Sequence, residues 1–465
     1  MRLLRSAAVL ALAAPLLAGG IDVSDLFGYA AEQAPAYLVH DNAPADNAVT
    51  DAGATLGRVL FYDRALSLNG TVSCASCHRQ AFAFGDTAHR SVGFDGALTG
   101  RHSMRLVNVG LGEGERMFWN ARAATLEEQT TQPIQDHGEM GFSGTDGQPA
   151  IDSLLRRLAA LERYRVLVPL AFGDGAVTEE RLSRALAQFV RSLTSYDSRF
   201  DAGYVAAGED LRAPFPNYTP AENRGKQLFL RTPGGANCQA CHRAPTFDVD
   251  PLTHNNGVTG DLADPSFEDL ANTRSPSLRD AFGPGGRVNG PFMHDGSLAD
   301  MRAVIAHYSD IEPNFGLDRR LRGDDNRGQR LDLDPEDVDD LVAFLRTLTG
   351  ERLYAEEAFA DPFEPDGSLV LTGVSRARTA GGPNLRIAAY PVPSRSRVTV
   401  ELPAGSATLA FTLRDSRGAE VASGLWRGGR GELDLAPLAS GSYLLQVWDP
   451  GDGRRDFARR WLVRE

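Results

Sequence analysis

The sequence predicts a mainly α-helical protein of two tandem modules, followed by a small all-β sandwich domain. Three observations lead to this fold class. The pattern GRVLF at residues 57–61 returns as GKQLF at residues 225–229, and each copy precedes the same cysteine motif. Apolar stripes with helical spacing occur up to residue 350. Short alternating runs that are typical of strands occupy residues 386–465.

The first twenty residues, MRLLRSAAVLALAAPLLAGG, have the composition of an export signal. Arg2 and Arg5 precede an apolar run from Ala7 to Leu17, and small residues follow. The run is too short to span a membrane, and no later stretch approaches twenty apolar residues. We therefore assign residues 1–20 to a signal peptide. We expect an exported protein without a membrane span, in the periplasm, at the cell surface or outside the cell.

The acidic composition limits the classes of partner. The chain has 48 Lys and Arg residues against 61 Asp and Glu residues, a net charge of −13 at pH 7. An acidic protein is not expected to bind nucleic acid, whose phosphates are also negative. The same charge is compatible with a basic electron-donor protein.

Two segments show the clearest helical pattern. Residues 181–193 place an apolar stripe on one face of a helix. Residues 334–350 begin with Asp334 as an N-cap and Pro335 in the first turn, and they reach Gly350 as a stop signal. We expect both stripes to pack in the core. They consist of Leu182, Leu186, Phe189, Val190 and Leu193 in the first segment, and of Val338, Leu341, Val342, Leu345 and Leu348 in the second.

The composition changes after residue 350 and divides the chain. We expect modules at residues 21–200 and 201–352, a linker at 353–385 and a β-sandwich at 386–465. The linker is rich in Asp, Pro, Gly and Ser from residue 361 on. The sandwich contains the runs RVTVELP, ATLAFTLRD, GELDLAPL and GSYLLQVWD. It has no histidine or cysteine, so we expect the chemistry to lie in the two modules.

The four cysteines of the chain form two identical C-x-x-C-H motifs. A single copy is compatible with a redox disulfide, half of a zinc site or a haem attachment site. The two motifs are Cys74, Cys77 and His78, and Cys238, Cys241 and His242.

Two copies with no cysteine left over favour haem. Thioether bonds to the two vinyl groups need this short spacing, and the next residue then lies under the iron as its proximal ligand. A zinc site of all four cysteines would leave both histidines unexplained. Neither copy has the βαβ context of a thioredoxin-like motif. We therefore expect two covalently bound haem c groups in two tandem cytochrome c-like domains.

Longer stretches between about residues 50 and 350 extend the pattern. They are LGRVLFYDRALSLNGTVSCASCH, FWNARAATLEEQTTQPIQDHGEMG, NCQACH and PFMHDGSLADMRAVIAHY. Together they resemble the bacterial di-haem cytochrome c peroxidases and the related MauG enzymes, which mature a tryptophan-derived quinone. The last part of the chain, with AAYPVPSRSRVTVEL and ASGSYLLQVWD, resembles the sorting domain of the type IX secretion route. That second resemblance implies the secretion machinery as a partner.

The resemblance implies different roles for the two haems. The first, on Cys74 and Cys77 with His78 as proximal ligand, is the haem that reacts with hydrogen peroxide. The second, on Cys238 and Cys241, stays six-coordinate and relays electrons. Its proximal ligand is His242. A small electron-donor protein, of cytochrome c or cupredoxin type, is the partner that this arrangement implies.

The distal ligand of the second haem separates the members of the family. In the peroxidases a methionine lies fourteen residues after the histidine of the MHDG-like motif, which is His294 here. At that distance this chain has Tyr308, as MauG-like members do. A phenolate ligand favours ferric iron and lowers the potential. We expect Tyr308 to ligate the second iron. The alternative is that Tyr308 packs in the core and that Met293 or His307 is the ligand.

The resemblance also implies acid–base and electron-transfer residues. Peroxide must lose a proton from one oxygen and gain one on the other before the O–O bond splits heterolytically, and one carboxylate can do both. The matching residue is Glu139, with Gln129 in the same distal pocket and Pro133 nearby. Without the resemblance, Glu139 is a solvated acid, and His137 is a surface residue or a second proton carrier. Trp119 matches the tryptophan between the two haems, and packing is its alternative role.

The chain departs from the family at the distal side of the first haem. The peroxidases carry a removable histidine ligand where this chain has Phe94, in SVGFDG. Phenylalanine cannot ligate iron. We therefore expect a five-coordinate first haem, unless His89 closes the site.

A second departure concerns calcium. The family has RN-x-P after the first haem, and its asparagine binds calcium between the domains. This chain has RHSM, with His102 in that place. Imidazole is a poor ligand for a hard cation that prefers oxygen. Asn289 and Pro291 would supply the two carbonyl ligands. The sequence leaves room for calcium but does not predict it.

These observations indicate an exported di-haem peroxidase that reduces hydrogen peroxide to water. The alternative enzyme is a MauG-like oxidase that modifies a partner protein. A non-catalytic electron-transfer cytochrome would have two saturated haems and no need for Glu139. A surface-anchored electron wire or adhesin is the interpretation that the β-sandwich adds.

Overall fold

The computed structural model describes two separate parts of the chain. In the first, residues 20–373 are described except 33, 39, 113–115, 232–234, 250–252, 261–267, 272–273, 275 and 324–326. In the second, the described residues are 388–390, 396–401, 408–415, 419–427, 430–448 and 458–464. Contacts divide the chain into two compact units, Met1–Gly373 and Val374–Glu465. The expected signal peptide up to residue 19, and residues 374–387 of the expected linker, lie outside the described part.

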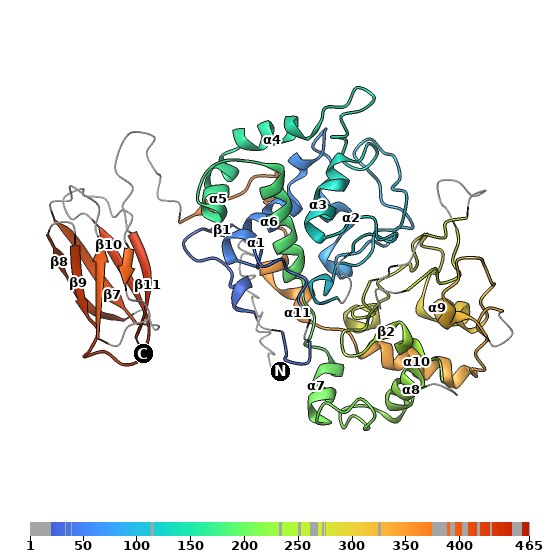
Figure 1. Cartoon of the computed structure of the whole chain (residues 1–465). Coiled ribbons are helices and arrows are strands. Elements are labelled where there is room, and N and C mark those ends of the chain that lie inside the picture. The colour runs from blue at the N-terminus through green and yellow to red at the C-terminus, as the bar shows by residue number, and fades with distance from the viewer. Residues whose placement is uncertain are drawn as a thin grey trace, which may run out of the picture. The chain divides into compact units, whose positions relative to one another are not determined.

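The first unit is rich in helices, which gather in two lobes (Figure 1). The first lobe, residues 51–192, contains α1 (Asp51–Tyr62), α2 (Cys74–Cys77), α3 (Leu126–Gln135), α4 (Ile151–Ala160), α5 (Glu162–Phe172) and α6 (Glu179–Ser192). The second lobe, residues 199–346, contains α7 (Arg199–Ala206), α8 (Pro220–Leu230), α9 (Met301–Ser309) and α10 (Pro335–Arg346), with a short hairpin of β2 (His242–Arg243) and β3 (Asp248–Val249).

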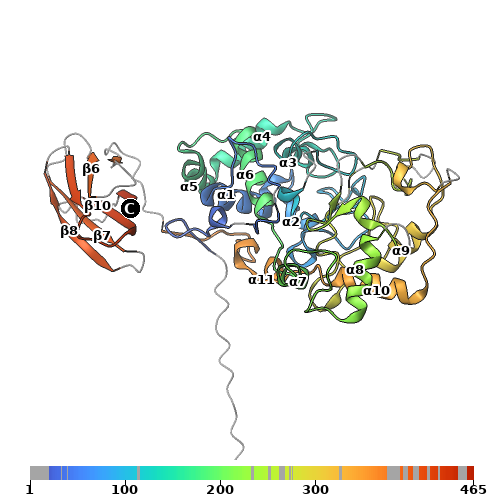
Figure 2. The same ribbon diagram turned by 60° about the horizontal axis from the view of Figure 1, so that its bottom comes forward.

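The repeated pentapeptides lie at equivalent helix crossings. GRVLF is part of α1, which packs on α6, and GKQLF is part of α8, which packs on α10. Figure 2 shows α8 and α10 side by side. A Cβ atom at Gly57 would lie 2.0 Å from the Ala185 carbonyl oxygen, and one at Gly225 would lie 1.9 Å from the Asp340 carbonyl oxygen. Only glycine permits helix axes to approach this closely. The repeated glycine therefore makes the same close helix contact in both lobes.

The expected helices are confirmed, with one difference at a helix end. In α6 the apolar stripe that includes Leu182, Leu186 and Phe189 is buried. Helix α10 is capped by Asp334, whose carboxylate accepts hydrogen bonds from the N–H groups of Glu336 and Asp337 in a capping box. It ends at Arg346 rather than near Gly350, and Thr347 closes it by donating its hydroxyl to the Phe344 carbonyl oxygen (2.7 Å).

The segment after α10 differs from the expected linker. It contains α11 (Arg352–Ala355), and Leu353 and Phe359 are fully buried in the core of the first lobe. The short strand β4 (Leu371–Thr372) pairs in parallel with β1 (Ile21–Asp22). Residues 353–373 therefore belong to the first unit, because two apolar side chains and a strand pair fix them there.

The second unit is a small all-β structure of two antiparallel sheets. One sheet has the order β11-β10-β7-β8 and the other β5-β6-β9. Val398 and Leu433 from one sheet and Leu413 and Leu445 from the other are buried in a single core, as in a sandwich. The strands are β5 (Ala388–Tyr390), β6 (Arg397–Glu401), β7 (Leu409–Arg414), β8 (Glu420–Trp426), β9 (Arg430–Asp434), β10 (Gly441–Trp448) and β11 (Ala458–Arg464).

None of the helices within the described ranges combines the length and the apolar character that crossing a membrane requires.

Candidate functional site

The first cysteine motif opens into a cavity of the first lobe. Cys74 and Cys77 are the ends of α2, and His78 follows directly; all three line the cavity. The Ser73 side chain caps the helix, and the Ser73 N–H donates to Ser76 Oγ (2.9 Å). This one-turn helix sets both thiols toward one space. Apolar side chains cover much of the remaining wall, among them Phe61, Val72, Leu106, Val109, Met117, Leu126, Leu186 and Val190.

The His78 ring is held in one tautomer. Its Nδ1 lies 2.9 Å from the Phe84 carbonyl oxygen, which can only accept, so Nδ1 carries the hydrogen. Burial lowers the pKa of His78, and the neutral ring has its Nε2 lone pair available. A neutral imidazole with its second nitrogen fixed by a carbonyl is the form that ligates a metal.

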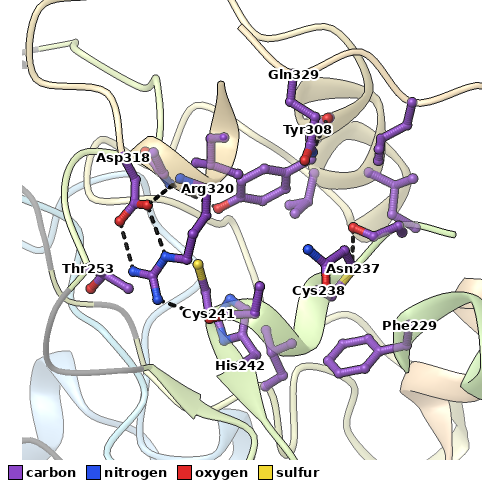
Figure 3. Close-up of a pocket in the computed structure, with 18 of the residues that line it drawn as sticks. Phe229, Asn237, Cys238, Cys241, His242, Thr253, Tyr308, Asp318, Arg320 and Gln329 are labelled. Atoms are coloured by element: carbon purple, nitrogen blue, oxygen red, sulfur yellow. Dashed lines mark hydrogen bonds and ion pairs between the residues drawn. The ribbon is translucent and has the colours of Figure 1, made fainter. Parts of the chain in front are cut away.

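The second motif lines a separate cavity in the second lobe (Figure 3). Cys238 and Cys241 lie in the turn between α8 and β2, and His242 is the first residue of β2. Burial lowers the pKa of His242 to about 4, so this imidazole is also neutral at physiological pH. The cavity wall is largely apolar and includes Phe229, Leu278, Met301, Val304, Ile305, Leu321, Leu341 and Leu345.

These two cavities fit two haem c groups better than the alternatives. Burial raises the pKa of Cys74 and Cys238 to about 12, which makes both thiols poor redox nucleophiles. The two cysteine pairs line different cavities, so they do not build one zinc site. Within the described ranges, no cluster of three or more His, Cys, Asp and Glu side chains could hold a metal ion. Two thiols and a neutral imidazole at the edge of a mainly apolar space are the donor set that haem c requires.

Glu139 lies in the wall of the first cavity, together with Gln129 and Pro133. Burial and then the charge of Asp136 raise the pKa of Glu139, the charge of Arg122 opposes them, and the result is a pKa of about 7. The carboxyl group is therefore close to half-ionised at neutral pH. A group in that state can accept and return a proton, and the catalytic role of Glu139 stays a prediction.

The backbone fixes Glu139 at this position. Its N–H donates to Asp136 Oδ1 (3.0 Å), and its carbonyl oxygen accepts from the Phe94 N–H (2.9 Å). The side chains of Phe94 and His137 are not part of the cavity wall. His137 is exposed and contacts Ser143 Oγ through Nδ1 (3.3 Å). The side chain of His89 is also exposed and outside this wall.

Trp119 lies between the two cavities and lines both. It is 8% exposed, and its Nε1 donates to the His102 carbonyl oxygen (2.7 Å). Its ring centroid is 6.3 Å from that of His294. This is the position expected for an electron relay, and the indole also packs there.

Tyr308, from the last turn of α9, lines the second cavity. Figure 3 shows the Tyr308 and His242 rings on either side of the cavity interior. The Tyr308 hydroxyl accepts a hydrogen bond from Asn256 Nδ2 (3.2 Å). Burial raises the pKa of Tyr308, so a phenolate here requires a cation in the cavity, such as iron.

The two alternative ligands are placed less favourably. His307 is absent from the wall of this cavity and lies 2.9 Å from the Asn256 carbonyl oxygen through its Nε2. Met293 lines a smaller adjoining cavity, and its sulfur accepts from Asn256 Nδ2 (3.2 Å).

The residues expected at the calcium site do not fit calcium. The Nδ1 of His102 lies 2.9 Å from the Ala88 carbonyl oxygen, and burial lowers the pKa of His102 to about 4. The Asn289 carbonyl oxygen accepts a hydrogen bond from Arg105 (3.3 Å), while Pro291 lines the same small cavity as Arg105. A guanidinium therefore faces a carbonyl that calcium would need.

Several site residues were not predicted from the sequence. The charge of Arg122 lowers the pKa of Glu139, and Asn256 donates a hydrogen bond to the Tyr308 hydroxyl. Arg274 lines both cavities. Arg105 is the fourth. Their roles arise from contacts between distant segments. Among them only Arg122 lies in a stretch that matched the family, so local sequence gave no signal for the other three.

Comparisons with known proteins define the class of this chain. Residues 51–209 match the family model described as di-haem cytochrome c peroxidase. The methylamine utilization protein MauG of Methylophilus methylotrophus is 33% identical over 318 residues, which cover 67% of this chain and 86% of that protein. The cytochrome c551 peroxidase of Nitrosomonas europaea is 26% identical over 314 residues, with 64% and 80% covered.

A crystal structure of a MauG-like protein associated with microbial copper homeostasis is also similar. It is 30% identical, has a TM-score of 0.56, and the alignment covers 71% of this chain and 98% of that one. The chain therefore belongs to the di-haem cytochrome c peroxidase family, which includes MauG, and it is a di-haem peroxidase-like oxidoreductase. Two haem c groups are the cofactors that membership implies.

Proposed function

We propose that this protein reduces hydrogen peroxide to two waters in the first cavity, with two protons and two electrons. The observation that carries the proposal is that Glu139 and His78 line the same cavity, which Trp119 connects to a second cavity of the same kind. When bound, the haems supply the iron that breaks the O–O bond and passes the electrons. The chain supplies ligands, proton transfer and the electron path. We take the two haem domains to be residues 21–200 and 201–352.

Proton transfer is the role of Glu139. Its carboxylate takes the proton of the first peroxide oxygen and returns it to the second, which leaves as water. A pKa of about 7 allows both steps near neutral pH, and Arg122 keeps the group from remaining protonated. Gln129 is a neutral polar neighbour in the same wall. It can orient peroxide without competing for the proton.

Electrons reach the first cavity through Trp119. The indole lines both cavities, and its Nε1 hydrogen bond to the His102 carbonyl fixes the ring. With haem bound, His242 and Tyr308 would hold the second iron, and their places in one cavity support this. Phe94 and the exposed His89 are outside the wall of the first cavity, which favours an open sixth position at the first iron.

Hydrogen peroxide is the proposed oxidant, and a small protein of cytochrome c or cupredoxin type is the proposed electron donor. The net charge of −13 favours a basic donor. Relatives named for peroxidase activity support this assignment.

A second candidate is the oxidation of a partner protein. Tyr308 favours it, because a phenolate stabilises the oxidised iron. The relatives named MauG favour it as well.

One experiment separates the two candidates. The holoprotein is mixed with peroxide and a reduced cytochrome c or cupredoxin. The proposal predicts donor oxidation at two electrons per peroxide over many turnovers. If the donor stays reduced while peroxide is consumed, and mass spectrometry of co-expressed proteins finds a peroxide-dependent oxidised product, the oxidase function replaces it.

We also propose that the second unit directs secretion. It is a separate compact unit of two antiparallel sheets, and residues 386–465 resemble a type IX sorting domain. Together with the proposed signal peptide, this supports a location outside the cytoplasm, in the periplasm or at the cell surface. If deletion of residues 386–465 abolishes function without altering secretion, the adhesin or electron-wire interpretation replaces the sorting role.

A further inference from the structure

Arg105 is a buried cation at the junction of the two lobes. It belongs to the first lobe by sequence, and the residue is 6% exposed. Its guanidinium donates to carbonyl oxygens of the second lobe, from Nη1 to Asn289 (3.3 Å) and from Nη2 to Ser277 (3.1 Å). The guanidinium carbon also lies 5.5 Å from the centre of the Phe292 ring. The side chain therefore joins the lobes through backbone dipoles.

The surroundings of Arg105 are those of a cation site. Both of its hydrogen-bond partners are neutral carbonyl oxygens, and its buried Nε has no hydrogen-bond partner. The acidic groups that favour its charged form are Tyr354 and then Asp280, whose Oδ1 accepts from the Tyr354 hydroxyl (3.1 Å). Burial lowers the pKa of Arg105 to about 10, so it stays protonated at neutral pH.

The Arg105 guanidinium occupies the position of the calcium site that the family resemblance implies. Asn289 O is one of the two expected calcium ligands, and Pro291, the other, lines the same small cavity. Carbonyl dipoles that converge on one point stabilise a calcium ion or a guanidinium, but two cations there would repel each other. The remaining candidate ligand, His102, has its Nδ1 at the Ala88 carbonyl oxygen.

We propose that Arg105 is a built-in replacement for an interlobe calcium ion, and that its fixed charge raises the reduction potential of the second haem. The same cavity is lined by Arg105, His242 and Tyr308. Ferric iron carries one more positive charge than ferrous iron, so a nearby cation favours the ferrous state. The second half of this inference rests on the proposed binding of haem at His242.

The first test measures calcium. The holoprotein is dialysed against calcium-free buffer, its metal content is measured, and its thermal unfolding is followed with added calcium or EGTA. The inference predicts no retained calcium and an unchanged Tm in both additions. One retained calcium per chain, or a Tm that falls with EGTA, would overturn it. This test needs no variant, so it stands even where substitutions of Arg105 fail to fold.

The second test measures potentials. Spectroelectrochemical titration is carried out on the parent, Arg105→Met and Arg105→Lys. At a fixed applied potential, we expect Arg105→Met to change the ferric-to-ferrous ratio of the second haem by roughly tenfold toward ferric, about 59 mV for one electron. The first haem should change less. Arg105→Lys keeps the charge and should retain the parent potential. An unchanged reduction potential of the second haem in Arg105→Met would overturn the electrostatic role of Arg105.

Both tests are independent of peroxide turnover. A parent without peroxidase activity but with a calcium-insensitive Tm would contradict the proposed function alone. An active peroxidase that requires calcium would contradict the role of Arg105 alone.

Discussion

The chemistry of Glu139 comes from its neighbours rather than from its residue type. Burial and the charge of Asp136 raise the pKa of Glu139 to about 7, against the opposing charge of Arg122. The hydrogen bonds of the Glu139 backbone to Asp136 and Phe94 fix its main chain at the cavity wall.

Glu139→Gln should lower the rate of peroxide reduction by roughly 10²–10⁴-fold, because the amide cannot accept the proton. The optical spectra of the two haems should remain those of the parent. Turnover with a reduced donor protein measures the change. Glu162→Gln, a substitution at a side chain that is 80% exposed, is the matched control and should have no effect. A parent-like rate in Glu139→Gln would remove Glu139 from the mechanism.

The rate of reaction with peroxide should rise as pH increases through about 7. The carboxylate is the base, and its pKa is raised to about 7, so the active form accumulates above that pH. Stopped-flow measurements from about pH 6 to about pH 8 test this. In Glu139→Gln the rate of reaction with peroxide should no longer depend on pH in this range. A rate that falls with rising pH would show that the protonated acid is the reactive form.

Local sequence spacing was sufficient for some site residues and not for others. The C-x-x-C-H spacing was enough to predict both attachment sites, because thiols and imidazole act within one turn of chain. Glu139 and Trp119 needed the family resemblance, since no local pattern separates them from a surface acid and a core indole. Arg105 and Asn256 could not be predicted, because their roles depend on carbonyl and hydroxyl groups far along the chain.

At the scale of elements, two close helix crossings organise the lobes. Gly57 in α1 and Gly225 in α8 allow these helices to reach the backbone of α6 and α10. Each crossing places the helix that leads into a cysteine motif. The repeat of these glycines was visible in the sequence, but the contact that requires them was not.

Gly57→Ala should destabilise the first lobe by about 1–3 kcal/mol. The new methyl group would meet the Ala185 carbonyl oxygen, which is backbone and cannot turn aside. Thermal unfolding followed by circular dichroism measures the loss. Gly175→Ala is the control, because the nearest atom to a Cβ there is 3.8 Å away and belongs to Pro169. Equal Tm values for the two variants would contradict the crossing.

Loss of the buried ion pair between Arg279 and Asp201 of α7 should lower the free energy of unfolding more than loss of an exposed pair. Arg279 Nη2 lies 2.8 Å from Asp201 Oδ1, and both side chains are nearly inaccessible. Asp201→Asn should cost about 3–5 kcal/mol, since it leaves a buried charge. Asp339→Asn, at the exposed pair with Arg302, should cost about 0–1 kcal/mol. Urea unfolding measures the loss of unfolding free energy in both variants. Equal losses would contradict a larger contribution from the buried pair.

The Asp201 pair also has a defined pH dependence. Burial alone would raise the pKa of Asp201, but the charge and hydrogen bonds of Arg279 lower it below its ordinary value. The stabilisation is therefore present above the unfolded pKa of about 4 and is lost as pH falls through the folded pKa. Asp201→Asn should remove this acid-sensitive part of the unfolding free energy.

At the scale of the whole molecule, the chain has two units with separate cores. The change of pattern from helical stripes to alternating strands predicted this division. The exact boundary was not predictable, because Asp, Pro and Gly near residue 361 suggested a linker while long-range packing of Leu353 and Phe359 holds that segment in the first unit.

Truncation tests the boundary. A chain that ends at Gly373 should keep both haems, its Tm and its turnover with peroxide, and should lose correct secretion. A chain that ends at Arg352 lacks the buried Leu353 and Phe359 and the strand β4, and it should unfold at lower temperature. Haem content, Tm and cell fractionation measure these results. A fully stable shorter chain would contradict the assignment of residues 353–373 to the first unit.

The most direct test of the account is low-temperature EPR of the ferric holoprotein, compared with Tyr308→Phe. The account predicts one high-spin signal, from the open first haem, and one low-spin signal, from the second haem with His242 and Tyr308. The low-spin signal should be lost in Tyr308→Phe and kept in the control Met293→Leu. Two low-spin signals in the parent, or a low-spin signal that survives Tyr308→Phe, would contradict the proposed ligand sets.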